Sequence, residues 1–587
     1  MSAAKTTTRR ASAGLLGLAW LACAATADPA PPRLLSPTFG RPLFSAPGGP
    51  LLVVAESGWS QSASPSGWLV EPNGSGRRIA LTYEPGAGPA VSPGAWIFRT
   101  PADVHPGTYD LRLGGPGGEL FEPHCVAILR PGAARRMVHL SNLNLGDPFA
   151  PRLDPALIDE INLVGPDAVI ATGDYLDATH ADPQAGWRDL CAGLARLDAP
   201  VIMACGDHDD LAHYSRFAAP SPVGLCALED IRVLLLHDHP LSSALSDEAQ
   251  MAWLEAQARQ PGYKGTMIVG HDERPNVLER WRSFCARLPD REAGSPLLYL
   301  AGGHRDWDGR EYARLVELAG AVYCRTGQGS TALRDGADGR PRYRVIDWTD
   351  GRLVLAGAGA SAMAPPSNVA GRLKLDFDAA NDGSANRIRL RAVNANPWRL
   401  DRLRGRVRVA KRGEARPWAA GLRLAEAVDR GGYWECQVEF DLPDKSYLRG
   451  VVGVGAAPPP PAPEVRIEAP SAIRMRRLRT AEGIAYCASD ATPRVQMVNP
   501  AQVGLWIEPR VLLDGAPLSY APDDPAREFA LGWRLRLEPG ARVSLRVDLS
   551  AVRVAPGERT LQVYVANGDV ETPAGRPLQI EIQDASQ

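Results

Sequence analysis

Two short apolar runs in the middle of the chain each end in a glycine followed by aspartate: AVIATGD (168–174) and VIMACGDHD (201–209). Short apolar runs bounded by turn residues are typical of strands buried on both faces. The glycine lets the backbone turn sharply where each strand ends, so the next polar side chain lies at the edge of the sheet. The two stretches therefore predict parallel strands with acidic groups at their carboxyl ends, which is where ligands bind in open α/β sheets.

The same pattern recurs on both sides of these stretches. Further apolar runs lie at 138–140, 233–236, 267–269 and 297–300, and the last two precede Gly270-His271 and Gly303-His304. We expect helices at 187–197 and 246–258, the second with Ser246 as its N-cap. Alternating strands and helices predict a layered α/β domain over residues 134–357.

The flanking sequence is divided into short runs by many of the 58 glycines and 52 prolines. Some runs alternate strictly between polar and apolar residues, as at 387–391 and 561–565. Regularly spaced short strands predict β-sandwiches. We expect an immunoglobulin- or fibronectin-like β-sandwich at 28–133, a second at 358–457 and a third at 464–587, with consecutive prolines at 458–461 as a stiff linker. The predicted fold class is a central α/β layered domain flanked by N-terminal and C-terminal β-sandwich domains.

The N-terminus has the pattern of a secretory signal peptide over residues 1–27. Lys5, Arg9 and Arg10 precede an apolar stretch at 13–25, and small residues follow at 25–27. We therefore expect an exported protein, periplasmic or secreted. Lipoprotein anchoring at Cys23 is a less favoured alternative. No later run is long enough to predict a transmembrane span.

Composition narrows the class of partner. The 65 Lys and Arg residues balance 67 Asp and Glu residues, so no basic excess indicates a nucleic-acid partner. The nine cysteines are scattered and form no Cys-x-x-Cys pair, which argues against a zinc knuckle. Any disulfide pairing cannot be read from the sequence.

Acidic and imidazole side chains follow the apolar runs in one order along the chain. Asp174, Asp207, His208, His271 and His304 all lie just beyond predicted strand ends. Carboxylates and imidazoles gathered at one edge are the usual ligands of divalent metals in hydrolytic sites. The sequence therefore predicts a metal centre. Asp177 is expected to hold the Asp174 loop, and His139 to lie in the core or on a sheet face. His180 and His213 follow motif residues closely, so either could contact substrate, although the favoured interpretation is that neither does.

These motifs resemble the calcineurin-like metallophosphoesterase family, and exported bacterial members of that family carry similar β-sandwich appendages. The resemblance implies that Asp174 bridges two metals, and that Asp207, His271 and His304 complete the second metal site. It gives His208 the role of the acid that protonates the leaving group. We expect Asp209 to orient His208 through a hydrogen bond.

The first metal site departs from the family pattern. Asn142, Asn144 and Asp306 stand where the family has an aspartate and two histidines, and Arg305 could act as a cation in place of the lost ligands. Asn142, Asn144, Asp174 and Asp306 form an all-oxygen set, which favours Mg, Ca or Mn over Zn or Fe, and an equal alternative is that this site holds no metal. For the two sites together, the expected cofactor is one or two divalent ions, drawn from Mn, Mg, Fe and Zn.

Two functions fit this sequence. The first is an exported, metal-dependent phosphoesterase-like hydrolase of phosphate mono- or diesters, with His208, Asp209 and Arg305 as its catalytic residues. The second is an inactive pseudoenzyme of the same fold that serves as a binding or scaffold protein. In either case the β-sandwiches could bind a cell-surface or protein partner.

Overall fold

The computed structural model describes most of the chain, and the predicted signal peptide and proline linker lie outside the described residues. The described residues are 33–56, 59, 65–72, 76–85, 94–115, 118–130, 132, 134–146, 152–177, 180–237, 247–271, 277–287, 297–302, 314–318, 321–325, 341–349, 352–355, 368–396, 398–443, 446–455, 464–468, 472–480, 483–488, 493–500, 505–522, 535–549, 557–567 and 570–584.

An eight-stranded sheet lies within the first predicted domain. Its strands are β1 (Leu34–Ser36), β2 (Leu43–Ser45), β3 (Pro50–Ala55), β4 (Ser66–Val70), β5 (Arg78–Tyr83), β6 (Ala95–Arg99), β7 (Gly107–Gly115) and β8 (Gly118–Ile128). They follow the order β1-β3-β6-β5-β4-β7-β8-β2 and enclose a core of their own. The sandwich architecture of this part stays a prediction.

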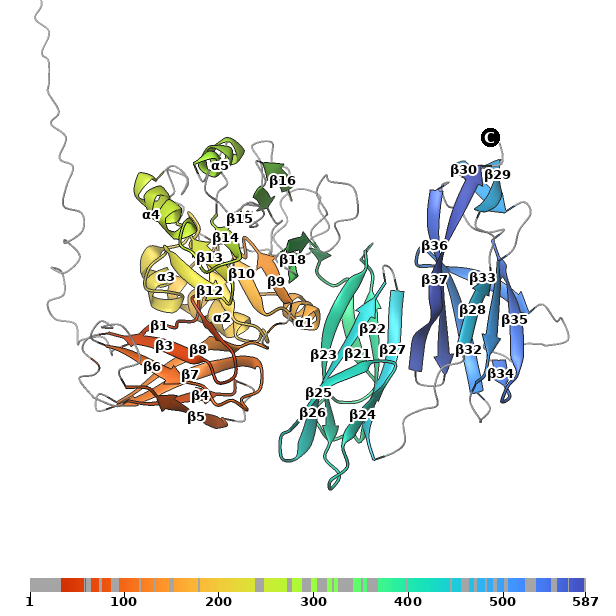
Figure 1. The fold of residues 1–587 in the computed structure, drawn as a ribbon, viewed down its shortest axis with the longest axis horizontal. Helices are drawn as coiled ribbons and strands as arrows, with labels where there is room; N and C mark the ends of the chain where they lie inside the picture. Colours follow the sequence, from red (N-terminus) through yellow and green to blue (C-terminus); the bar gives the residue numbers. More distant parts are fainter. Residues whose placement is uncertain are drawn as a thin grey trace, which may run out of the picture.

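Strands and helices alternate through the next part of the chain (Figure 1). The helices are α1 (Pro155–Val164), α2 (Pro183–Leu194), α3 (Leu211–Phe217), α4 (Glu248–Ala258) and α5 (Val277–Ala286). The strands are β9 (Arg135–Leu140), β10 (Ala168–Ala171), β11 (Val201–Met203), β12 (Gly224–Leu228), β13 (Ile231–Leu235), β14 (Gly265–Val269), β15 (Leu297–Ala301), β16 (Arg314–Leu318), β17 (Ala321–Arg325), β18 (Arg342–Thr349), β19 (Arg352–Leu355) and β20 (Asn368–Val369).

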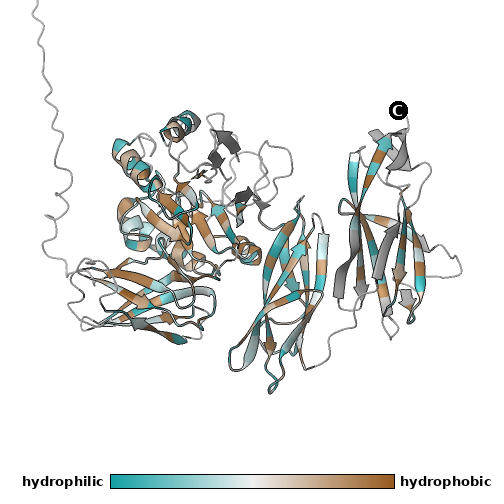
Figure 2. Ribbon diagram, in the orientation of Figure 1, coloured by the Kyte–Doolittle hydropathy of each residue, from teal (hydrophilic) through white to brown (hydrophobic). Residues whose placement is uncertain are grey.

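These strands form two sheets rather than one. The first has the order β11-β10-β9-β18-β19, with β20 paired to β18, and the second has the order β12-β13-β14-β15-β17-β16. The parallel strands β9, β10 and β11 belong to the first sheet, and β13, β14, β15 and β17 to the second. One apolar cluster contains residues of both sheets, including Ile170, Ile202, Val233 and Met267. The sheets therefore pack face to face, and the apolar residues lie along these central strands (Figure 2).

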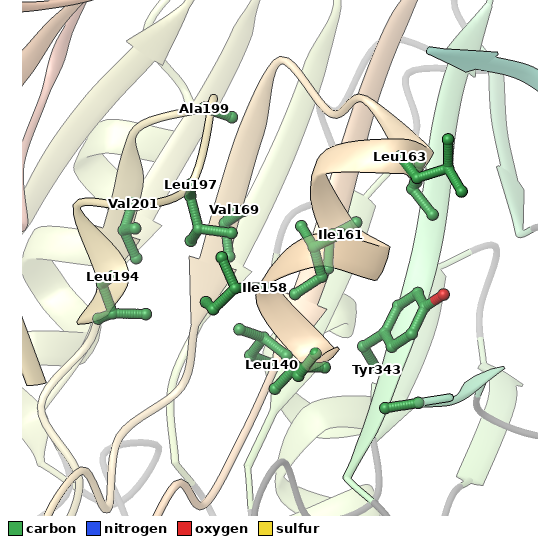
Figure 3. Close-up of a cluster of buried hydrophobic side chains, with 14 of the residues drawn as sticks. Leu140, Ile158, Ile161, Leu163, Val169, Leu194, Leu197, Ala199, Val201 and Tyr343 are labelled. Atoms are coloured by element: carbon green, nitrogen blue, oxygen red, sulfur yellow. The ribbon is translucent and has the colours of Figure 1, made fainter. Parts of the chain in front are cut away.

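Helices cover the outer face of each sheet. Ile158 and Ile161 of α1 pack with Leu140 and Val169 of the first sheet in the cluster that Figure 3 draws. Met251 of α4 and Trp281 of α5 pack on the second sheet. Every residue of β10, β11, β13, β14 and β15 is buried, because each strand has a sheet on one face and other apolar groups on the other. This burial confirms the interpretation of the short apolar runs.

The helix ends follow local capping rules. Asp154 caps α1 ahead of Pro155, and Gly165 ends α1 with φ 64°. The helix predicted at 246–258 is α4, but its N-cap is Asp247, whose side chain accepts from the Gln250 amide. The expectation of Ser246 as N-cap was wrong by one residue, because both adjacent side chains suit the position. Among the described helices, none has the length and apolar character required to cross a bilayer.

The C-terminal part consists of strands. They are β21 (Leu373–Phe377), β22 (Arg387–Asn394), β23 (Leu400–Ala410), β24 (Pro417–Ala420), β25 (Arg423–Asp429), β26 (Tyr433–Leu442), β27 (Ser446–Val454), β28 (Glu464–Glu468), β29 (Ala472–Thr480), β30 (Gly483–Ala488), β31 (Arg494–Val498), β32 (Leu505–Leu513), β33 (Ala516–Pro522), β34 (Leu535–Leu537), β35 (Arg542–Asp548), β36 (Gly557–Asn567) and β37 (Val570–Asp584). One sheet path joins the strands on both sides of the predicted linker, through the pairing of Arg449 with Glu571.

The α/β domain is joined to the strands that follow it by buried polar contacts. Arg136 on β9 donates to the Asp401 carbonyl at 2.6 Å, and Asp347 on β18 of the same domain holds the Arg136 guanidinium through both carboxylate oxygens, at 2.7 and 2.9 Å. Glu160 on α1 accepts hydrogen bonds from the Tyr343 hydroxyl and from the amides of Gly371 and Leu373. The apolar cluster of α1 also continues into β22 and β23. Helix α1 is therefore covered by the C-terminal strands.

Burial raises the pKa of Glu160 to about 7, although hydrogen bonds to its carboxylate from Tyr343 and from the main chain of residues 371–373 oppose this shift. Because the folded pKa lies above the unfolded value of 4.5, the folded state is favoured fully below pH 4.5. That advantage is lost as the pH rises through about 7.

We predict that Glu160→Gln flattens this part of the pH dependence of stability. The wild-type protein should lose on the order of 3 kcal/mol more than the variant between pH 4.5 and pH 8. Urea unfolding of both proteins at several pH values measures this difference. Because the substituted side chain places an amide group against the Gly371 N–H, only the slope with pH is informative. Parallel slopes for the two proteins would contradict the assignment.

Candidate metal centre

The loops that follow β9 and β10 run side by side. The main-chain N–H of Asn142 donates to the Gly173 carbonyl at 3.2 Å, and the main-chain N–H of Asn144 donates to the Asp174 carbonyl at 2.9 Å. Asn142, Asn144 and Asp174 have φ values of 49°, 44° and 54°, a left-handed conformation that Asn and Asp adopt more readily than most residues. These turns place the side chains of Asn142 and Asp174 at the same end of the sheet.

Asp209 holds the Asp174 loop against the loop that follows β11. Its carboxylate accepts hydrogen bonds from the main-chain amides of Asp174, Tyr175 and Gly206, at 3.0, 2.9 and 2.8 Å. Burial and the neighbouring charge of Asp174 raise the pKa of Asp209 to about 7. These contacts show that Asp209 positions the Asp174 loop, and its predicted role in orienting His208 stays a prediction.

The close approach of these two loops requires glycine. A Cβ at Gly206 would lie 2.5 Å from both the amide nitrogen and Oδ1 of Asp174. Any side chain at this position would therefore displace the aspartate. The glycines of the two Gly-Asp motifs thus allow contact between neighbouring loops, in addition to turning the chain at each strand end.

Asp174, Asp207 and His208 form a cluster at this end of the first sheet. One ligand atom from each of the three lies within 4.8 Å of the others. Asp174 is buried, Asp207 is half-buried and His208 is exposed, so the cluster runs from the interior to the surface. This arrangement leaves the His208 side open to solvent.

His271 reaches the same cluster from the second sheet. Its Nε2 atom lies 2.9 Å from Asp174 Oδ2 and 3.7 Å from Asp207 Oδ1. Its Nδ1 atom makes a short hydrogen bond to the Thr172 carbonyl oxygen. A carbonyl only accepts, so Nδ1 carries the proton and Nε2 is directed at the two carboxylates. This is the usual way in which a second hydrogen bond orients a metal-binding imidazole.

Asn142 presents its amide nitrogen, and not its oxygen, to Asp174. Its Nδ2 donates to Asp174 Oδ2 at 3.1 Å, and its Oδ1 accepts from the Ser141 hydroxyl at 2.6 Å. The predicted role of Asn142 as an oxygen ligand is not what these contacts show. The hydrogen bond described for Asn144 joins its main-chain N–H to the Asp174 carbonyl and does not involve its side chain. His304, Arg305 and Asp306 lie outside the described residues.

The other polar residues that the sequence singled out have structural contacts. His139 is buried on β9 and bonds to the Thr172 hydroxyl at 3.1 Å, and burial lowers its pKa to about 3, with a smaller contribution from the charge of Arg344. His180 accepts from the Asp182 amide, and His213 bonds to Asp210 at the start of α3. The expectation of His139 as a core residue is confirmed by its burial.

Sequence reasoning missed Thr172 and Ser141, which orient His271 and Asn142 respectively. Thr172 acts on His271 through its main-chain carbonyl, which every residue type has, so no sequence signal marks it. Ser141 precedes a predicted ligand directly, and a hydroxyl at that position was a signal that could have been used.

The described donor set fits one divalent cation. Asp174 and Asp207 supply two carboxylates, and His271 supplies an imidazole nitrogen directed towards them. Mixed oxygen and nitrogen ligands suit Mn, Fe or Zn, and Mg is compatible with the carboxylates. At the predicted first site, by contrast, Asn142 turns the N–H of a neutral amide towards Asp174, and an N–H does not bind a cation.

The comparison with protein-family models agrees with the family resemblance. Residues 139–305 match the family model described as calcineurin-like phosphoesterase. A purple acid phosphatase from seeds of yellow lupin (Lupinus luteus) is a similar solved structure, with 13% identity, a TM-score of 0.35, and coverage of 58% of this chain and 73% of that chain. A predicted phosphoesterase from Streptococcus pneumoniae has 12% identity, a TM-score of 0.21, and coverage of 40% of this chain and 97% of its own. The comparison with curated proteins finds no match.

We predict that Asp209→Ala weakens Mn²⁺ binding about 10- to 100-fold, because three main-chain amides around Asp174 lose their acceptor. Stability should also fall by a few kcal/mol. Calorimetric titration with Mn²⁺ and urea unfolding measure the two effects.

Asp210→Ala is the matched control for this variant. Asp210 caps α3 through the His213 amide, so its loss should cost about 1 kcal/mol and leave Mn²⁺ affinity unchanged. Equal Mn²⁺ affinity in the two variants would contradict the positioning role of Asp209.

Proposed function

We propose, from the calcineurin-like phosphoesterase domain at residues 139–305, that the protein is an exported, metal-dependent hydrolase of phosphate mono- or diesters. One observation carries the proposal. Asp174 and Asp207 from the first sheet meet an Nε2 atom from the second sheet, and the Thr172 carbonyl fixes the direction of that atom. Such a convergence of carboxylates and a pre-oriented imidazole is a ready site for a divalent ion.

Charge explains why the cation is needed. Two carboxylates lie at the centre of the cluster, and one of them is buried. A phosphate ester carries negative charge and would be repelled by them. A divalent cation, when bound, cancels this repulsion, polarises a phosphoryl oxygen and lowers the pKa of a water molecule.

The side chains around the ion position the site, and one of them can supply a proton. The Asp174 loop is fixed by Asp209, and Asp174 Oδ1 accepts from the His208 amide at 3.3 Å, which holds the His208 backbone beside the cluster. The exposed imidazole of His208 therefore lies on the side from which a substrate approaches. We assign to it the protonation of the leaving oxygen. The sheets that flank the domain would tether it or bind a cell-surface partner.

The second candidate is an inactive binding or scaffold protein of the same fold. The observation in its favour is that Asn142 turns its amide N–H towards Asp174, where a second cation would require an oxygen or nitrogen lone pair. Absence of turnover with every metal in the intact protein would support this alternative.

We predict that the exported protein hydrolyses p-nitrophenyl phosphate or its bis-ester when supplied with Mn²⁺. Asp174→Ala and His271→Ala should each lower kcat/KM by about 100-fold or more, because they remove groups that hold the ion. Asp189→Ala changes an exposed carboxylate on α2 and should have no effect. Release of p-nitrophenol under identical metal loading measures all four proteins. Unchanged turnover in the two site variants would reject the proposed centre.

We further predict that His208→Ala discriminates between leaving groups. An alkyl phosphate needs protonation as its oxygen leaves, so the variant should lose about 10²- to 10⁴-fold on this substrate. The loss on p-nitrophenyl phosphate should be much smaller, because nitrophenolate leaves without a proton. Metal content should stay unchanged. Equal losses on both substrates, or loss of the ion, would show that His208 acts as a ligand and not as an acid.

A further inference from the structure

Asp174 is the residue that the family resemblance places between two metal ions, and its surroundings differ on its two sides. His271 Nε2 lies 2.9 Å from Oδ2, which suits joint binding of a cation. Asn142 Nδ2 donates a hydrogen bond to the same Oδ2 atom at 3.1 Å. One oxygen of the shared carboxylate therefore faces a metal-binding nitrogen and also a hydrogen-bond donor.

The orientation of the Asn142 amide is fixed by its two neighbours. The Ser141 hydroxyl donates to Asn142 Oδ1 at 2.6 Å, which leaves the NH₂ group for Asp174. The reverse orientation would oppose two acceptor oxygens at about 3 Å, which is unfavourable. Ser141 and Asn142 are both buried, so the amide is not exposed to bulk water.

Charge gives an independent argument for a single ion. Asp174 and Asp207 carry two formal negative charges, which one divalent cation neutralises. Asn142 and Asn144 are neutral and add no anionic ligand beside Asp174. A second divalent ion beside Asn142 would therefore receive no compensating negative charge from these two side chains.

We propose that this centre holds a single divalent cation, and that the Asn142 amide takes the place of the second one by donating a hydrogen bond to Asp174. Asn142 is then a positioning residue: it keeps the Asp174 carboxylate in the orientation that serves the ion beside His271. The inference rests on the proposed function, since it concerns the ion content of the same site.

The experiment counts ions in the full-length protein. Wild type, Asn142→Leu, Ser141→Ala and Asn142→Asp are loaded with Mn²⁺ and freed of excess. Each is then analysed by elemental mass spectrometry and by electron paramagnetic resonance, which distinguishes an isolated Mn²⁺ ion from a magnetically coupled pair. Calorimetric titration gives the affinity for Mn²⁺.

We expect one Mn²⁺ per chain and the spectrum of an isolated ion in the wild type, in Asn142→Leu and in Ser141→Ala. Asn142→Leu should bind Mn²⁺ about tenfold more weakly at this unchanged stoichiometry, because Asp174 loses a partner that orients it. Ser141→Ala retains the amide and should show a smaller loss. Asn142→Asp places a carboxylate against Asp174, so it should bind a second ion and give the coupled spectrum.

Two Mn²⁺ ions per wild-type chain would overturn this inference and leave the proposed hydrolase intact. A fall in stoichiometry with Asn142→Leu would also overturn it, because Asn142 would then be a ligand. A wild-type protein that binds no Mn²⁺ would reject both this inference and the proposed function.

Discussion

The candidate site depends on one contact between the two sheets of the α/β domain, the hydrogen bond from His271 Nδ1 to the Thr172 carbonyl. Thr172 follows β10 in the first sheet, and His271 follows β14 in the second. The contact joins the carboxyl ends of the two sheets and at the same time selects the imidazole nitrogen that faces Asp174. Loss of this register would separate the ligands even if both sheets remained folded.

Support for this contact extends into the core behind it. His139 on β9 bonds to the Thr172 hydroxyl, and burial keeps the His139 imidazole neutral at physiological pH. Asp209 fixes the Asp174 loop from the opposite side through three amides. The exposed His208 thus lies at the edge of a centre in which Asp174 and His271 are buried and held by hydrogen bonds, and Asp207 is half-buried. This division suits a site in which the ion is held firmly and the substrate exchanges.

The strand-end motifs predicted which side chains converge, because a buried apolar run followed by Gly-Asp or Gly-His constrains both the strand and its exit. The sequence could not divide the strands between two sheets, because a strand that is buried on both faces has the same apolar pattern whether the domain contains one sheet or two. It also gave no sign of the main-chain contacts of Asp209: adjacency to His208 suggested a side-chain partner, and the carboxylate accepts from three main-chain amides as well. The Asn142 amide illustrates a further limit, because residue type does not reveal which end of an amide faces its neighbour.

The contacts of α1 have a consequence for how this chain can be divided. Glu160 is held by the main chain of residues 371–373, and the apolar cluster of α1 continues into β22 and β23. A fragment that stops at residue 357 would expose the apolar surface of α1 to water. It would also leave the Glu160 carboxylate without its main-chain hydrogen-bond donors. The smallest fragment that keeps the contacts of α1 and carries the Asp174 cluster therefore extends past the family match into the strands that follow it. Those strands are part of the structural support of the α/β domain.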